Sequence, residues 1–228
     1  MAFCLLSCGQ PTAPDTTKSE EPVDPPLNLT VEFINDVPGK QLLGVVPTFE
    51  VLHKGMDWSE GPLQLPDGRV ICSDVPRNHI LVYDKGKTEV YLDNSGSSPP
   101  NYANEQGSNG LHLDQENRLL LCQHGARRVV RMEAPLDAPA HKFTVLADNY
   151  RGKRFNSPND LVIAKDGRLL FTDPIYGLPG QGDSPLLELE YCGVFRIEPA
   201  GGVHLMSKHY LRPHRIGLSP DLKTLYRT

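Results

Sequence analysis

The sequence lacks any apolar run near the roughly 20 residues that a membrane-spanning helix needs, and its Lys and Arg residues are scattered rather than clustered. With a net charge of −5, this scatter argues against a nucleic-acid-binding protein. The five cysteines form no CxxC pair and have no His at zinc-site spacing, so we do not expect a zinc cluster. No segment of useful length has the apolar period of a helix.

Turn-forming residues are abundant, with 20 Gly and 21 Pro that cluster between short apolar runs. This arrangement is typical of β-structure with many turns. A length of 228 residues suits one core or two small domains. Cys72 and Cys122 lie inside apolar runs, and we expect both to be buried small hydrophobic residues.

The N-terminal part differs in composition from the rest. "LLSC" at 5–8 has the Leu-x-small-Cys form of a bacterial lipoprotein cleavage site, which would make residues 1–8 a signal remnant and leave a lipid anchor at Cys8. The Pro/Thr/Glu-rich stretch 9–40 suits a flexible tether, and the folded domain is expected over 41–228. Only seven residues precede Cys8, fewer than a signal peptide needs. The lipoprotein interpretation, with a start assigned too late, predicts the periplasm or cell envelope, and an ordinary N-terminus with a cytoplasmic protein is the alternative.

Four segments along the chain resemble one another, and each is a polar turn followed by an apolar strand. They are "PDGRVICSD" (66–74), "QENRLLLCQ" (115–123), "KDGRLLFTD" (165–173) and "PDLKTLYRT" (220–228). Aligned on Arg69, Arg118, Arg168 and Lys223, they are separated by 49, 50 and 55 residues. A period near 50 is typical of a repeat architecture.

Further strands surround each of the first three segments, so that each unit holds four. A four-stranded unit at this period is a propeller blade, and the fold class we predict is an all-β, propeller-type fold. The fourth unit has only "RIGLS" (215–219) and "TLYRT" (224–228), so the chain is expected to supply three and a half to four blades and to be incomplete at its C-terminus. "FEVLH" (49–53) has no partner within its own blade.

A polar residue precedes the inner strand of every unit, nine residues before each aligned Arg or Lys. These residues are Glu60, Asn109, Asn159 and His214. Inner strands line the central channel, so equivalent positions are expected to gather at one end of it. Carboxylate and amide oxygens are what calcium prefers; the alternative is that these residues cap loops and turns.

Four stretches of the chain resemble the senescence-marker-protein/gluconolactonase/regucalcin-like family. They are "WSEGPLQLPDGR" (58–69), "SNGLHLD" (108–114), "RFNSPNDLVIAKDGRLLFTDPIYG" (154–177) and "RPHRIGLSPDLKTLY" (212–226). The bacterial gluconolactonase branch is the most similar, on "GKRFNSPNDL" and "FTDPIYGLPG". The resemblance implies a six-bladed propeller that hydrolyses sugar lactones with one divalent cation, usually calcium, at the channel mouth.

The resemblance also implies roles for particular residues. Glu60 and Asn159 match two metal ligands, and His214 stands where the family has the Asn of "RPNG". A fourth ligand, an Asp that is the usual general base or nucleophile, would fall just beyond Thr228, so the catalytic residue stays unassigned. Substrate contacts or pocket walls are implied for Asn109, His124, Arg154 with Lys153, Asp160, Asp173 and Tyr176. Structural roles are the alternative for His124, Asp173 and Tyr176, and a solvated loop for Lys153 and Arg154.

The sequence departs from the family where it reads "RPHR". Imidazole is a softer ligand that suits zinc or manganese better than calcium, and Arg215 would bring positive charge toward a cation. Two functions are therefore weighed. One is metal-dependent hydrolysis of a sugar lactone to the aldonic acid. The other is a non-catalytic or decayed propeller fragment that acts at most as a binding protein.

Overall fold

A computed structural model describes residues 4–5, 40–41, 49–96 and 105–228 of the chain. The chain forms two compact units, Ala2–Lys54 and Gly55–Thr228. In the first unit, β1 (Cys4–Leu5) pairs antiparallel with β2 (Glu50–Val51). The strand expected near 49–53 therefore forms, and its partner comes from the N-terminus. The predicted lipid anchor at Cys8 lies outside the described residues, as does nearly all of the predicted tether.

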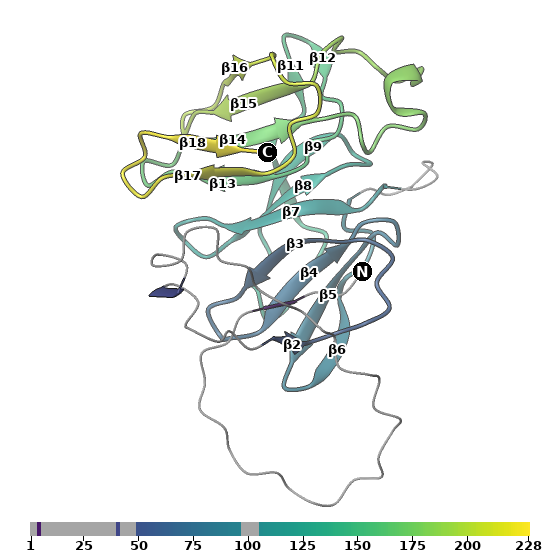
Figure 1. Ribbon diagram of the computed structural model, residues 1–228, viewed down its shortest axis with the longest axis vertical. Coiled ribbons are helices and arrows are strands. Elements are labelled where there is room, and N and C mark those ends of the chain that lie inside the picture. The colour runs from purple at the N-terminus through teal and green to yellow at the C-terminus, as the bar shows by residue number, and fades with distance from the viewer. Residues whose placement is uncertain (1–3, 6–39, 42–48, 97–104) are drawn as a thin grey trace, which may run out of the picture. The chain divides into compact units, whose positions relative to one another are not determined.

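The second unit consists of antiparallel sheets whose strands follow one another in chain order (Figure 1). The first sheet holds β3 (Ser59–Gln64), β4 (Val70–Asp74), β5 (His79–Asp84) and β6 (Lys87–Leu92). The second holds β7 (Ser108–Leu113), β8 (Leu119–Gln123), β9 (Arg128–Met132) and β10 (Phe143–Ala147). The third holds β13 (Leu161–Ile163), β14 (Leu169–Asp173), β15 (Gly193–Ile197) and β16 (Val203–Ser207). β17 (Ile216–Leu218) pairs with β18 (Leu225–Arg227).

These sheets confirm the four-stranded units expected from the repeats, and the all-β, propeller-type fold. The second strand of each complete sheet, β4, β8 or β14, is buried at every position. Such a strand pairs on both edges and is covered on both faces, which explains the unbroken apolar run with which each of the three begins. Cys72 and Cys122 lie in β4 and β8 and are buried, as expected. The number of blades in a complete ring stays a prediction.

Apolar cores lie between neighbouring sheets rather than at one centre. Ile71 and Ile80 of the first sheet pack with Leu121 and Val130 of the second. Between the second and third sheets, three buried aromatic rings pack against one another. Phe155 meets Phe171 edge-on at 5.0 Å between ring centroids, and Phe171 stacks on Phe195 at 5.5 Å. Because each apolar core is shared by two adjacent sheets, it fixes their positions relative to each other.

A short hairpin between the second and third sheets was not anticipated from the sequence. It pairs β11 (Asn149–Tyr150) with β12 (Lys153–Arg154). Arg151 and Gly152 form its turn with φ values of 54° and 80°, and a type I′ hairpin turn requires positive φ at both positions. The Arg-Gly pair is a weaker hairpin signal than the Asn-Gly that usually marks such a turn. A 3-10 turn, η1 (Gln181–Asp183), follows later. Among the described residues, no helix is both long enough and apolar enough to cross a membrane.

Candidate active site

The inner strands of successive sheets lie against one another, which lines up the residues at their starts. β3 contacts β7, β7 contacts β13, and β13 contacts β17. Two glycines make the approach close. A Cβ on Gly61 would lie 2.3 Å from the carbonyl oxygen of Asn109, and one on Gly110 would lie 2.8 Å from that of Asn159. Each glycine directly follows a residue of the predicted site, so the close packing of backbones keeps Glu60, Asn109 and Asn159 in register.

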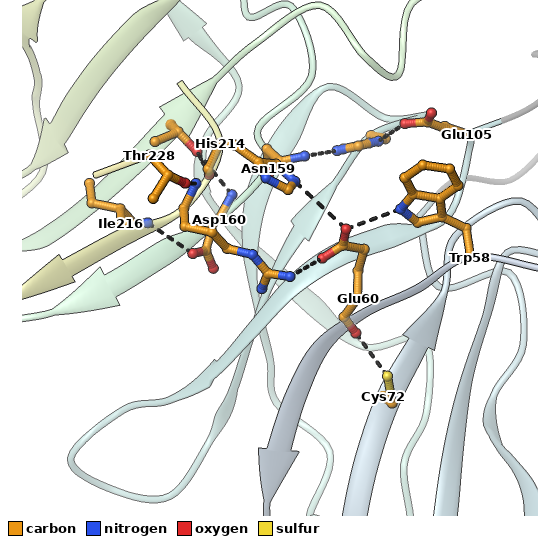
Figure 2. A network of polar contacts seen from close by, with 12 residues as sticks. Trp58, Glu60, Cys72, Glu105, Asn159, Asp160, His214, Ile216 and Thr228 are labelled. Carbon is orange, nitrogen blue, oxygen red and sulfur yellow. Dashed lines mark hydrogen bonds and ion pairs between the residues drawn. The ribbon is translucent and has the colours of Figure 1, made fainter. Parts of the chain in front are cut away.

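His214 reaches the same end of the sheets from the segment before β17. The hydroxyl of Thr172 donates to the His214 carbonyl at 2.9 Å, and the His214 amide donates to the Thr228 carbonyl at 2.8 Å. The imidazole meets the ring of Tyr176 edge-on, at 5.6 Å between centroids. Its Nε2 lies 3.6 Å from Oε1 of Glu60 (Figure 2). The structure thus brings Glu60 and His214 together, although they belong to the first and fourth of the sequence repeats.

Glu60 is 5% exposed and is surrounded by nitrogen donors. The indole Nε1 of Trp58 donates to Oε1 at 3.0 Å, and Nη2 of Arg215 donates to Oε2 at 2.7 Å. Burial by itself raises the pKa of Glu60, but the contacts with His214, Trp58 and Arg215 outweigh it and hold the pKa below its usual value. The carboxylate is therefore an anion at neutral pH, with Trp58 on one oxygen and Arg215 on the other.

Asn159 offers a buried oxygen with no partner in the part of the chain that is described. The residue is 1% exposed, and its Nδ2 lies 3.2 Å from Nε2 of His124, which leaves Oδ1 without a hydrogen bond. Burial lowers the pKa of His124 to about 4, so its imidazole is neutral at pH 7. Since Nδ2 of the amide donates, Nε2 accepts and the proton sits on Nδ1, 3.9 Å from Oε2 of Glu105. An unpaired buried acceptor is costly in a protein interior, so we expect Oδ1 of Asn159 to bind a ligand.

Two further carboxylates of the predicted site bind backbone amides. Oδ2 of Asp160 accepts from the Ile216 amide at 3.0 Å and so ties β13 to β17, while burial raises the pKa of Asp160. Asp173 accepts from the amides of Asn156 and Ser157 at 2.8 Å each, and its burial raises its pKa to about 7. Asp173 thereby fixes the segment that leads to Asn159. The predicted contacts of Asp160 and Asp173 with substrate stay predictions.

The remaining residues of the predicted site lie in different surroundings. Asn109 is buried, and its side chain makes no hydrogen bond to the residues that the structure describes. Arg154 lies on the β11–β12 hairpin, where its Nη2 donates to the Ala126 carbonyl at 2.8 Å. Lys153 is exposed on the same hairpin. Within the described ranges, no contact joins Arg154 to Glu60. The predicted contacts of Lys153 and Arg154 with substrate stay predictions.

Sequence reasoning missed two neighbours of this cluster, Trp58 and Glu105. Trp58 is the one tryptophan in the chain and lies two residues before Glu60, hence on the same side of an extended segment, so the signal was present. Glu105 is half-buried, and its pKa is raised by burial and then by the charge of Glu60. It belongs to none of the four aligned positions, and no pattern in the sequence marks it.

The donor atoms suit a hard divalent cation in type, with one conflict. The Glu60 carboxylate and the unpaired Asn159 Oδ1 are the kinds of oxygen that calcium takes. Among residues 40–41, 49–96 and 105–228, no three His, Cys, Asp or Glu side chains group to hold a metal. The conflict is the guanidinium of Arg215, which already neutralises Glu60.

Comparison with known proteins identifies the family. Residues 58–228 match the family model described as the SMP-30/gluconolactonase/LRE-like region. The chain belongs to this family. The resemblance stated from four sequence motifs is therefore confirmed.

Individual relatives agree with this assignment. The chain is 37% identical to a protein of Zymomonas mobilis named gluconolactonase, in an alignment of 191 residues that covers 81% of the chain. A solved gluconolactonase from Xanthomonas campestris is 33% identical, covers 82% of the chain and superposes with a TM-score of 0.67. A calcium-binding regucalcin from Agrobacterium tumefaciens is 14% identical over 75% of the chain, with a TM-score of 0.51, and shows the shared fold alone. The chain spans 52% of the Zymomonas protein, 59% of the Xanthomonas protein and 52% of the regucalcin.

Proposed function

We propose that this chain carries the substrate site of an enzyme that hydrolyses a sugar lactone to the aldonic acid. One observation supports this most directly, namely that Glu60 and His214 lie 3.6 Å apart although they belong to the first and fourth repeats. Asn159 adjoins them through His124, whose pKa the charges of Glu60 and His214 both affect. The relatives from Zymomonas and Xanthomonas are gluconolactonases, which makes a gluconolactone the first substrate to test. A complete ring of six blades belongs to the same proposal.

Lactone hydrolysis needs a polarised carbonyl, a water nucleophile and groups that orient the ring. We propose that Glu60 and the Asn159 Oδ1 hold a divalent cation, which would act on the lactone carbonyl as a Lewis acid. Calcium is the first candidate because both ligands are oxygens, and manganese or zinc follows if the His214 imidazole also binds it.

The side chains around this point orient the sugar. Asn109 presents an amide for a sugar hydroxyl, and Tyr176 forms a wall against which the His214 ring is held. Neutral His124 keeps the Asn159 amide turned so that its oxygen stays available. The group that activates water stays unassigned.

The proposal is tested by acid release from glucono-1,5-lactone, followed with a pH indicator and corrected for spontaneous hydrolysis. We expect turnover that EDTA abolishes, that added calcium restores and that Asn159→Ala eliminates. Asn149→Ala is the matched control, because Asn149 lies on the exposed hairpin and its side chain bonds only its near neighbours Asp148 and Gly152 among the described residues; it should keep the rate. A folded chain that binds the lactone without turnover would contradict the proposal and favour the alternative of a binding protein.

We also propose that the protein is held in the cell envelope by a lipid on Cys8. The support is the "LLSC" motif followed by a Pro/Thr/Glu-rich stretch. Mass spectrometry of the native N-terminus provides the test. A diacylglyceryl cysteine at position 8 is expected, and an unmodified Met1 in the mature protein would refute the anchor.

A further inference from the structure

Glu60 and Arg215 form an ion pair that joins the first sequence repeat to the fourth, at one end of the inner strands. Nη2 of Arg215 lies 2.7 Å from Oε2 of Glu60, although the two residues are 155 positions apart in the sequence. Glu60 is 5% exposed, whereas the Arg215 side chain is 46% exposed. The carboxylate therefore has a fixed, buried position, and the guanidinium reaches it from the solvent side.

The backbone at Arg215 is held in place independently of this pair. The Arg215 amide donates to the Thr228 hydroxyl at 3.3 Å, and the Thr228 amide donates to the Arg215 carbonyl at 3.2 Å. Arg215 lies directly after His214, at the position where the first two units have Gly61 and Gly110. The third repeat has Asp160 at this position, so the fourth repeat alone places a long cationic side chain here. Because the backbone is tied, the side chain alone has to rotate for the ion pair to open.

The same carboxylate is the one charged ligand that the proposed function assigns to a divalent cation. A guanidinium at hydrogen-bond distance from Oε2 blocks that oxygen, and its positive charge repels a second cation at the same place. Charge–charge interactions at a partly buried site are screened less than in water. Removing the charge of Arg215 should therefore change the binding of a neighbouring cation strongly.

We infer that Arg215 and a divalent cation are alternative partners of Glu60, so that the cation binds only when the Arg215 guanidinium has swung out into solvent. Arg215 is thus a built-in competitor that lowers the affinity of this site for divalent cations. The inference rests on the proposed function in one respect, since it takes Glu60 to be a cation ligand. It adds that this chain binds the cation more weakly than the same site would without Arg215.

The test is a calorimetric titration of the full chain with CaCl2, repeated with MnCl2, in the absence of any lactone. Arg215→Met removes the charge and keeps most of the length, and we expect it to bind the cation at least about tenfold more tightly than the wild-type chain. Arg215→Lys keeps the charge and should bind as the wild type does. Arg215→Gly, which places a glycine there as in the first two units, should show the same gain as Arg215→Met and gives a second route if either variant fails to fold. Circular dichroism checks the fold of each.

Two controls locate the effect. Arg212→Met removes an equal charge three residues away, where Arg212 lies over the Tyr176 ring rather than on Glu60, and it should leave cation affinity unchanged. Glu60→Gln combined with Arg215→Met should lose the gain. Equal affinities in the wild type and in both neutral Arg215 variants, or no cation binding in any of them, would overturn the inference. Cation binding is measured here without turnover. A chain that is inactive on lactone but binds the cation more tightly in the neutral Arg215 variants would contradict the proposed function and still support the competition between Arg215 and the cation.

Discussion

Asp173 should make the stability of the folded chain depend on pH in an unusual direction. Its carboxylate is fully buried at the end of β14, and burial raises its pKa from 3.8 to about 7. Between about pH 4 and pH 7 the folded chain keeps a proton on Asp173 that the unfolded chain has released. Stability from this residue is therefore complete below about pH 4 and is lost as pH rises toward 7.

The size of the effect follows from the shift. One pKa unit corresponds to about 1.4 kcal/mol, so the full change amounts to at most about 4 kcal/mol of unfolding free energy. Asp173→Asn cannot ionise and should lack this slope. Each oxygen of Asp173 faces a backbone amide, of Asn156 or of Ser157. The Nδ2 group of Asn would take the place of one of these oxygens and cannot accept a hydrogen bond, so the variant should start about 1 kcal/mol less stable at low pH.

Urea unfolding followed by circular dichroism at pH 4 to 8 measures this difference. The deficit of Asp173→Asn should shrink and then reverse as pH rises. Asp166→Asn is the control, because Asp166 is exposed and its pKa is lowered, first of all by its hydrogen bond with Arg168. The stability that Asp166 contributes is lost as pH falls. The difference in unfolding free energy between the wild type and Asp166→Asn should therefore change little with pH, and in the opposite direction. Parallel pH profiles for wild type and Asp173→Asn would refute the reasoning.

Three other expectations concern packing. Gly61→Ala should destabilise the chain by roughly 2–4 kcal/mol, since φ is 56° and the added Cβ meets the backbone of the next sheet. Gly86→Ala, where φ is 84° and the space is open, should cost only about 1–2 kcal/mol. Equal losses of unfolding free energy in urea would contradict this. Phe171→Ala should cost about 3–5 kcal/mol in the same assay because it empties the centre of the aromatic core; a loss below about 1 kcal/mol would mean that the core is not packed as described. The thiols of Cys72 and Cys122 should resist iodoacetamide until urea unfolds the chain, because burial raises both thiol pKa values; labelling of either in the folded chain, detected by mass spectrometry, would contradict their burial.

Much of the fold was predictable because it repeats. Each unit has the same order of turn and strand, so the spacing between Arg69, Arg118 and Arg168 predicted where the sheets would begin and end. The same periodicity placed Glu60 and His214 together, since equivalent positions in successive units occupy equivalent positions in space. The β11–β12 hairpin interrupts the repeat, and no periodic signal marked it.

The chemistry of individual side chains was less predictable than their positions. Asp160 and Asp173 are predicted site residues whose carboxyl groups also accept backbone amides, from Ile216 and from Asn156, which lie 56 and 17 residues away in the sequence. The donors on Glu60 come from Trp58, two residues away, and from Arg215, 155 residues away. A local pattern can identify the first kind of contact but cannot identify the second.

The central claim is that the cluster around Glu60 and Asn159 hydrolyses a sugar lactone. The most direct test is the initial rate of acid release from glucono-1,5-lactone by the purified chain, compared with Glu60→Gln under identical conditions. We predict turnover above the spontaneous rate for the wild-type chain and a rate at background for Glu60→Gln, with similar melting temperatures for the two proteins. Equal rates for the two folded proteins, or no turnover by either, would contradict it.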